Sequence, residues 1–221
     1  MENLRELILS QAILFAAHLH RHTSTLDVQG ACDIEMAQHG YRTERIVSIL
    51  VKRISLHPCD AFPLSDFEIE HLPFAARLHD IGKIGVPVAI LEKPSRLDSM
   101  EMSIMSLHPI LGQAIIRATR PYAEAHRKVL DLIETAVLHH HERWDGTGYP
   151  GNCVGPAIPL PARIVALADA YDAITSPRVY KPGRPHSEAM QLLVRESGKQ
   201  FDPALLAPFC DVADEIGAKQ I

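Results

Sequence analysis

The apolar residues of this chain recur mostly at the three- and four-residue spacing of amphipathic α-helices, and alternating apolar and polar stretches are nearly absent. This pattern predicts an all-α fold, with the second helix loosened near Gly40. We expect helices over residues 3–20, 28–56, 65–80, 98 to beyond 109, 121–141 and 159–175, with two shorter helices near 187 and 203.

Local signals mark the ends of several of these helices. Ser65 and Asp98 are each followed three residues later by a glutamate, which is the spacing of a capping box at a helix start. Gly82 is expected to end the third helix. Because no repeat, linker or low-complexity segment interrupts the pattern, we expect an N-terminal helix in residues 1–25 and one compact domain in residues 26–221.

Composition narrows the classes of function. With 221 residues, of which 47% are apolar, the chain can bury a real core, so intrinsic disorder is excluded. The net charge is -5 and no block of lysine or arginine occurs, which argues against binding to long nucleic acid or to an anionic membrane. No apolar run reaches the ~18 residues that cross a bilayer. The widely spaced cysteines form no CxxC pair, which argues against zinc ribbons and favours a reducing cytoplasm.

Histidine is unusually frequent, with 13 residues, and it is the commonest metal ligand in proteins. His79 and Asp80 end the apolar segment FAARLHD and are followed at once by IGKIGVP. An adjacent imidazole and carboxylate can bind one cation, and the carboxylate can bridge two. A histidine that interacts favourably with a helix C-terminus explains the pair about equally well. Lys83, three residues further on, favours a functional site.

A second group of histidines lies in LHHHERWDGTGYPG, where His139, His140 and His141 precede a glycine-rich loop. Successive residues on a continuous helix point about 100° apart, so they can share one site only where the helix ends. The glycines predict such an end. A metal site is therefore favoured over a solvated helix end, with one of the three histidines as a bystander.

Other candidates are weaker when each is taken alone. Glu35 and His39 lie four residues apart on one helical face, as residues on solvated surfaces also do. His108, which precedes a proline, is by itself more typical of packing. Asp169 lies in the apolar run IVALADAYDAI, where a buried carboxylate is costly unless a cation or hydrogen bonds compensate it. Asp172 either shares that site or is a hydrogen-bond partner of its ligands.

The order of these motifs resembles that of the HD-GYP family, bacterial cyclic di-GMP phosphodiesterases that form a branch of the HD hydrolases. The matching segments are HDIGKIGVP, ILEKP, HP with LG, HHERWDGTGYPG, IPLPARIVALADAYDAIT, SPRVYK and FDP. They extend from about Glu35 to Phe209. A lone HD pair is unspecific, whereas this ordered series is very specific. The resemblance implies an HD-type helical bundle with a GYP loop at residues 148–150.

The resemblance also implies a centre of two or three metal ions, with iron as the expected metal and manganese as the alternative. The implied metal ligands are Glu35, His39, His79, Asp80, His108, His140, His141 and Asp169. Asp80 is the implied bridging ligand, and His139 is left as the extra histidine. Glu35 would belong to a third metal. The chain departs from the family there, because it has EMAQH where the family often has ETGxH.

The activity that the resemblance implies is hydrolysis of cyclic di-GMP to pGpG, and in some members onward to GMP, by in-line attack of a hydroxide that bridges the metals. Asp80 and Lys83 are the expected catalytic residues. Lys83 would stabilise negative charge that develops on the phosphate. The expected substrate-binding residues are Lys83, Tyr149, Arg178 and Lys181, of which the arginine can clamp a phosphate through two hydrogen bonds.

Two alternatives to this function stay open. Some family members prefer cyclic GMP-AMP, and no residue of the sequence indicates which base is bound. A non-catalytic module that binds cyclic di-GMP is the alternative from another class of function. The resemblance implies a GYP face that contacts signalling proteins such as diguanylate cyclase (GGDEF) domains, and residues 1–25 are a candidate segment for homodimerisation.

Overall fold

The computed structural model describes residues 1–19, 32–56, 62–177 and 182–218, and within these ranges it describes side chains outside 13–19 and 32–36. The α-helices are α1 (Glu2–Leu19), α2 (Cys32–Leu56), α3 (Asp66–Arg77), α4 (Val88–Leu91), α5 (Ser99–Met105), α6 (His108–Thr119), α7 (Arg127–His139), α8 (Leu160–Thr175), α9 (His186–Arg195) and α10 (Pro203–Ala218). Short 3₁₀ helices are η1 (Ile81–Gly85), η2 (Arg120–Tyr122), η3 (Glu124–His126) and η4 (Gly155–Ala157). The described ranges contain no β-strand, which confirms the predicted all-α fold.

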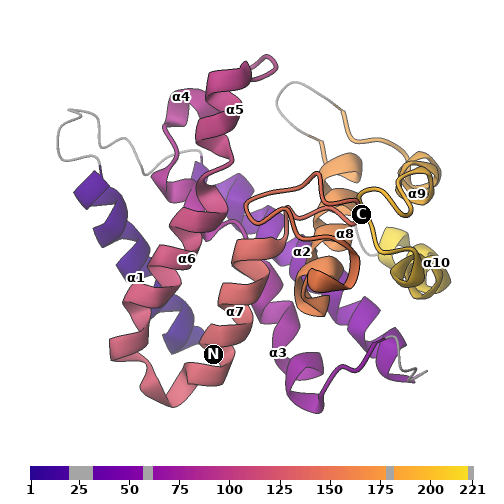
Figure 1. Cartoon of the computed structure of the whole chain (residues 1–221), viewed down its shortest axis with the longest axis horizontal. Coiled ribbons are helices and arrows are strands. Elements are labelled where there is room, and N and C mark those ends of the chain that lie inside the picture. The colour runs from indigo at the N-terminus through magenta and orange to yellow at the C-terminus, as the bar shows by residue number, and fades with distance from the viewer. Residues whose placement is uncertain (20–31, 57–61, 178–181, 219–221) are drawn as a thin grey trace.

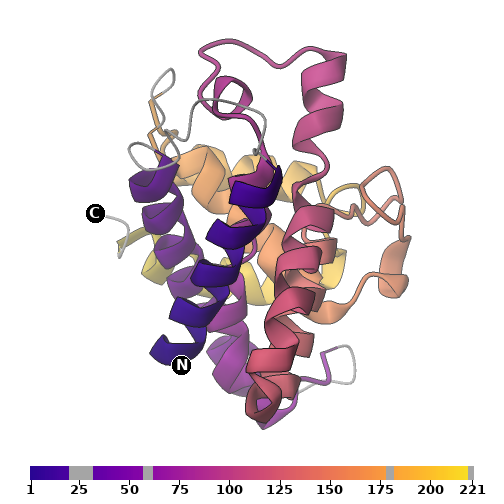
Figure 2. The ribbon, with the colours of Figure 1, turned by 90° about the vertical axis from the view of Figure 1, so that its left-hand side faces the viewer.

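The core lies where α2, α3, α7 and α8 pack against one another (Figure 1). Leu50, Leu72, Ile133 and Ile164, one from each of these helices, have no solvent-exposed surface. On one side of this bundle α1 packs against α6 and adds Ile8 to the same core, while α9 and α10 pack on the opposite side (Figures 1 and 2). The helices α4 and α5 project from the bundle at the top of Figure 1.

Both predicted capping boxes are confirmed. Ser65 Oγ accepts the backbone amide of Glu68, whose carboxylate accepts the Ser65 amide at 2.9 Å. Asp98 and Glu101 make the same reciprocal pair at the start of α5. The helix α3 then ends at Arg77, so the HD pair lies in the turn between α3 and η1 and not on the helix itself.

Two of the expected helices are divided in the structure. Residues 98 to beyond 109 form α5 and α6, because Pro109 lacks an amide hydrogen and occupies the first turn of α6 directly after His108. Pro121 opens only the 3₁₀ helix η2, and α7 begins at Arg127. The prediction of one continuous helix in each segment is therefore wrong. The last helix, α10, has 16 residues and is longer than expected.

Gly40 does not loosen α2, which is helical throughout residues 32–56. A Cβ atom at this position would lie 2.6 Å from the carbonyl oxygen of Arg77, closer than a real Cβ contact. The glycine therefore allows α2 to approach the end of α3. The expected loosened turn is wrong, and close packing of the two helices is the reason for the glycine. This approach brings His39, the preceding residue, toward the HD turn.

Gly82 is required by a second close approach, between η1 and the start of α6. A Cβ atom there would lie 1.9 Å from the carbonyl oxygen of His108 and 2.4 Å from the amide nitrogen of Gly112. No larger residue fits without moving the backbone. The contact fixes the HD turn against the first turn of α6.

None of the described helices has both the length and the apolar character of a membrane span.

Candidate metal centre

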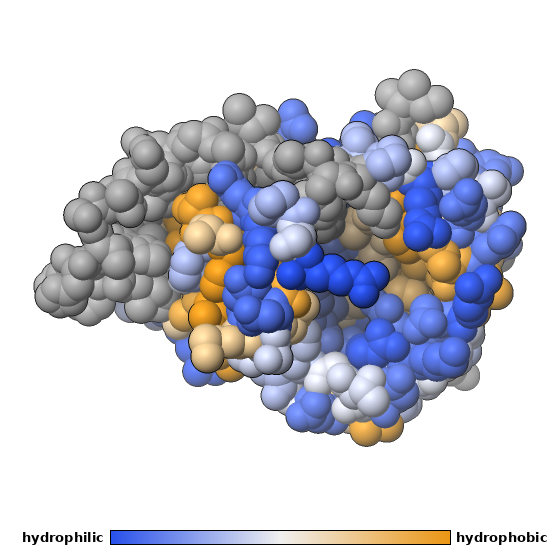
Figure 3. Space-filling model, turned by 90° about the horizontal axis from the view of Figure 1, so that it is seen from above, coloured by the Kyte–Doolittle hydropathy of each residue, from blue (hydrophilic) through white to orange (hydrophobic). Residues whose placement is uncertain are grey.

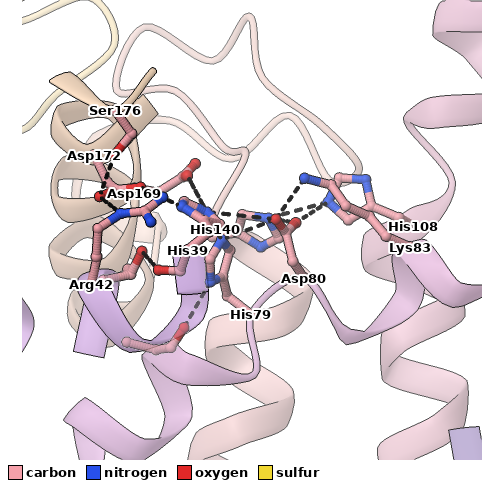
Figure 4. Close-up of polar contacts among 12 residues, drawn as sticks. His39, Arg42, His79, Asp80, Lys83, His108, His140, Asp169, Asp172 and Ser176 are labelled. Carbon is pink, nitrogen blue, oxygen red and sulfur yellow. Dashed lines mark hydrogen bonds and ion pairs between the residues drawn. The ribbon is translucent and has the colours of Figure 1, made fainter. Parts of the chain in front are cut away.

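Residues from five separate segments of the chain converge around Asp80 (Figure 4). They are His39 on α2, His79 and Asp80 in the turn after α3, His108 at the start of α6, His140 and His141 after α7, and Asp169 on α8. We call these residues the Asp80 cluster. The structure thus brings together the predicted ligands whose side chains it describes.

The two oxygens of Asp80 face two different groups of imidazoles. Oδ2 lies 3.4 Å from Nε2 of His79 and 3.7 Å from Nε2 of His39. Oδ1 lies 3.3 Å from Nε2 of His108 and 3.7 Å from Nε2 of His140. A carboxylate between two sets of nitrogen donors is in the position of a ligand that bridges two cations.

Two further side chains complete these groups. Asp169 Oδ1 lies 3.1 Å from Nε2 of His39 and 3.7 Å from Nε2 of His79, so it belongs with the first group. His141 belongs with the second group, whose donor atoms all lie within 4.8 Å of one another. Each side of Asp80 therefore offers several nitrogen or oxygen donors to one point.

Backbone carbonyls fix the orientation of several rings. Nδ1 of His79, His108 and His140 donates to the carbonyl three residues earlier, at 2.7, 2.8 and 2.9 Å. Because a carbonyl can only accept, Nδ1 of each ring carries a proton, and Nε2 is the nitrogen that offers a lone pair whenever the ring is neutral. The Nε2 atoms of His108 and His140 are only 3.2 Å apart. Two lone pairs at that distance repel each other unless a cation or a proton lies between them.

The Asp80 cluster fits divalent transition metals. Imidazole nitrogen and carboxylate oxygen are suitable ligands for iron, manganese and zinc. Asp80 Oδ1 is buried and has no hydrogen-bond donor among the described residues. Leaving a buried carboxylate oxygen without a partner costs free energy, which a cation bound beside it would offset.

Burial and neighbouring charges shift the histidine pKa values in opposite directions on the two sides of Asp80. Burial opposes protonation of His79, but the carboxylates of Asp80 and Asp169 outweigh it and raise the pKa to about 10. Burial lowers the pKa of His140 to about 4 and also lowers that of His141. At neutral pH, without cations, His79 is thus protonated while His140 and His141 are neutral.

Lys83 extends from η1 to the same carboxylate. Its Nζ atom lies 2.5 Å from Oδ2 of Asp80. Burial would raise the pKa of Asp80, but the charges of Lys83 and His79 outweigh it and hold the pKa well below its ordinary value. Asp80 is therefore an anion throughout the neutral range.

Asp172 supports the site from behind one ligand. Its buried carboxylate accepts His39 Nδ1 at 2.6 Å, Arg42 Nε at 2.7 Å and Ser176 Oγ at 3.0 Å (Figure 4). His39 then presents Nε2 to the Asp80 cluster. This contact favours the role of hydrogen-bond partner over that of a shared ligand. Sequence reasoning missed Arg42, although its position three residues after His39 places it on the same helical face.

Glu142 holds the GYP loop against the end of α7. Its buried carboxylate accepts the amide of Gly151 at 2.6 Å and that of Cys153 at 3.0 Å. The ring of Tyr149 stacks on His141, with ring centroids 4.9 Å apart and planes at 26°. Sequence reasoning gave Glu142 no role. Its place directly after the paired histidines, in a motif that ends in glycines, was the available signal.

A cavity of about 440 Å³ adjoins the metal centre and lies within the size range of small-molecule sites. Its lining includes His141, Tyr149, Asp169, Leu192 and Glu196. Seen from above, the molecule is hollowed near its centre, and both hydrophilic and hydrophobic side chains border the hollow (Figure 3).

The structure does not describe the side chains of three predicted site residues. The backbone of Glu35 belongs to α2, one turn before His39, but its side chain lies outside the described residues. Arg178 and Lys181 also lie outside the described residues. Their expected roles stay predictions.

Comparison with known proteins finds similar sequences among bacterial phosphodiesterases. A Vibrio cholerae protein named cyclic di-GMP phosphodiesterase is 41% identical over 187 residues, which cover 84% of this chain and 38% of that protein. A Thermotoga maritima protein of the same name is 38% identical, covering 83% and 46%. A 3'3'-cGAMP-specific phosphodiesterase from Vibrio cholerae is 32% identical, covering 75% and 31%. The chain spans less than half the length of each of these relatives.

A solved structure and a family model complete the comparison. An HDG"Y"P protein from Bdellovibrio bacteriovorus shares the fold with a TM-score of 0.60 at 17% identity, covering 92% of this chain and 62% of that one. A family model described as HD domain matches residues 29–205, the greater part of the chain. The chain therefore belongs to the HD domain family, and its expected relationship to the HD-GYP branch is confirmed.

Proposed function

We propose that this chain is a metal-dependent phosphodiesterase domain that hydrolyses cyclic di-GMP to pGpG, with GMP as the product of a second cleavage. The observation that carries the proposal is the position of Asp80, whose two oxygens face two groups of imidazole nitrogens. Relatives named cyclic di-GMP phosphodiesterases support the substrate class.

The site would hold two cations, with iron as the metal and manganese as the alternative, and Asp80 would be a ligand of both. The ligands on one side are His39, His79 and Asp169, and those on the other are His108, His140 and His141. Glu35 would be a ligand of a third cation. When bound, such cations lower the pKa of a water molecule toward neutrality and neutralise phosphate oxygens.

The chain's own residues prepare this site for hydrolysis. Lys83 keeps Asp80 ionised, and Asp172 fixes the ring of His39, so neither ligand has to reorganise during the reaction. Cleavage forms a bond between phosphorus and a water oxygen and breaks the bond to the ribose 3' oxygen. The side chain of Lys83 is partly exposed beside Asp80. We assign it the stabilisation of charge on the phosphate and the departing oxygen.

Substrate binding is proposed along the adjoining cavity. The lining residue Tyr149 presents an aromatic ring beside His141, where a guanine can stack. Arg178 and Lys181 are proposed to bind the second phosphate, and this role rests on the sequence resemblance.

Cyclic GMP-AMP is the second candidate substrate, because a relative specific for 3'3'-cGAMP is also similar to the chain. We further propose a cytoplasmic location, which the widely spaced cysteines support, and contacts of the GYP loop with diguanylate cyclase domains or with a second copy of the chain.

The proposal is tested with purified protein loaded with Fe²⁺ or Mn²⁺ and given cyclic di-GMP and 3'3'-cGAMP separately. We expect pGpG to form from cyclic di-GMP, and Asp80→Asn to abolish the reaction. Asp211→Asn is the control, because this aspartate is half exposed and pairs with Arg53, away from the cluster. Faster cleavage of cGAMP favours the second substrate. Tight binding without turnover in the metal-loaded protein contradicts the enzymatic function.

A further inference from the structure

A second group of metal-binding side chains lies at the end of α7, outside the Asp80 cluster. It consists of His139, Glu142 and Cys153, whose donor atoms all lie within 4.8 Å of one another. We call these residues the His139 cluster. The proposed phosphodiesterase chemistry uses neither His139 nor Cys153.

His139 is the histidine that the family resemblance leaves without a role. Its Nδ1 atom is buried and has no hydrogen-bond partner among the described residues. The nearest charged atom is Oε1 of Glu142, at 3.7 Å. This distance is too long for a hydrogen bond. An imidazole nitrogen that is buried without a partner costs free energy unless it binds something else.

The spacing of the donors suits one transition-metal ion. Two ligands of a tetrahedral Zn²⁺, each ~2.0–2.3 Å from the ion, are ~3.3–3.7 Å apart. The 3.7 Å between His139 Nδ1 and Glu142 Oε1 agrees with that separation. Thiolate, imidazole and carboxylate are all zinc ligands, and the thiolate distinguishes this cluster from the Asp80 cluster, whose donors are nitrogen and oxygen only.

Glu142 is already oriented for such a role. Each of its oxygens accepts one backbone amide, from Gly151 and from Cys153, which leaves a second lone pair on each oxygen. Hydrogen bonds of this kind, made to a ligand from behind, hold it in position for a metal.

An activated thiol is the competing explanation for Cys153. Activated cysteines lie beside positive groups that lower the thiol pKa. Burial and the Glu142 carboxylate instead raise the pKa of Cys153. The surroundings of this thiol therefore keep it protonated and do not activate it as a nucleophile.

We propose that His139, Glu142 and Cys153 bind a Zn²⁺ ion separate from the catalytic metals. Its fourth position is open to water, because the side chains of His139 and Cys153 are only partly buried. The ion ties the end of α7, directly before His140 and His141, to the segment that follows the GYP motif.

Cobalt substitution tests this site independently of catalysis. The full chain is stripped with a chelator and titrated with Co²⁺, whose bond to a thiolate gives a charge-transfer absorption in the near ultraviolet. The Asp80 cluster has no thiolate and cannot produce this band. We expect the band in the wild-type protein, with displacement by Zn²⁺, and we expect His139→Ala to weaken the Co²⁺ affinity of the site by ~10-fold or more.

Cys153→Ser and Cys210→Ser form a matched pair of variants. Cys210 is an exposed free cysteine on α10, so its substitution should leave the band unchanged. Cys153→Ser should abolish the band while the far-ultraviolet circular dichroism stays that of the wild type. The proposal is overturned if the wild-type protein gives no band, or if the band persists in the Cys153→Ser variant.

Discussion

Replacement of Asp172 by asparagine should weaken metal binding, although Asp172 is a hydrogen-bond partner of His39 and not itself a predicted metal ligand. The carboxylate accepts Nδ1 of His39 at 2.6 Å and two nitrogens of Arg42 at 2.7 and 3.0 Å. Asparagine has a similar shape, but it has one acceptor oxygen instead of two. The amide oxygen cannot serve His39 and both guanidinium nitrogens equally well. The ring of His39 is then less firmly held, and Nε2 loses the electron donation of an anionic partner.

The size of the effect follows from similar contacts in metalloproteins. Loss of a partner behind a metal-binding histidine lowers metal affinity ~10- to 100-fold, which is ~1.4–2.7 kcal/mol. Only the cation on the side of His39 should be affected. The second cation, on the side of His108 and His140, should bind with nearly its original affinity.

The measurement is a Mn²⁺ titration of chelator-stripped protein, with free Mn²⁺ followed by electron paramagnetic resonance. Asp202→Asn is the matched control, because Asp202 is also buried and accepts a hydrogen bond from Arg163 at 2.6 Å, away from the cluster. Both variants lose a buried ion pair, so their thermal stability should fall similarly. The reasoning is refuted if Asp172→Asn binds Mn²⁺ as tightly as the wild type, or if Asp202→Asn weakens binding equally.

Three further outcomes are expected. Lys83→Met should lower kcat by ~10²-fold with the metal content unchanged, since one charge-stabilising group is lost; unchanged kcat would remove Lys83 from the reaction. Gly82→Ala should destabilise the fold by ~3 kcal/mol in thermal unfolding, because the added Cβ meets the carbonyl of His108 at 1.9 Å, and a near-neutral effect would contradict that packing. In the metal-free protein, burial lowers the pKa of His140 from 6.5 to about 4, so the unfolded state binds the extra proton between these values. The free energy of unfolding should therefore fall by up to ~3 kcal/mol as the pH drops through this range. In urea unfolding measured at several pH values, His140→Asn should make this free energy depend less on pH.

The periodicity of apolar residues was sufficient to predict the fold class and most helices, because each helix buries one face against its neighbours. The capping boxes at Ser65 and Asp98 were predictable for a local reason, since all their partners lie within three residues. The breaks at Pro109 and Pro121 were missed. The path of the chain around a proline depends on what packs against it, and periodicity does not report this.

The candidate site likewise contains some residues that local motifs predict and others that only the packed fold brings together. The motif order pointed to His79 and Asp80, because the chemistry of adjacent donors can be read locally. The contact between Arg42 and Asp172 joins residues 130 positions apart, so only the packed fold brings them together. The close approach at Gly40 was missed for the same reason, since a glycine within a helix gives no sign of which backbone it admits.

Asp80 and its neighbours also connect metal binding to folding. The donors come from segments as far apart as His39 and Asp169, and they meet only when α2, α6, α7 and α8 are packed. A cation that binds the folded chain and not the unfolded chain stabilises it by mass action, by ~2.7 kcal/mol at a free concentration of 100 times its Kd. The cellular supply of metal would then influence how much of this protein stays folded.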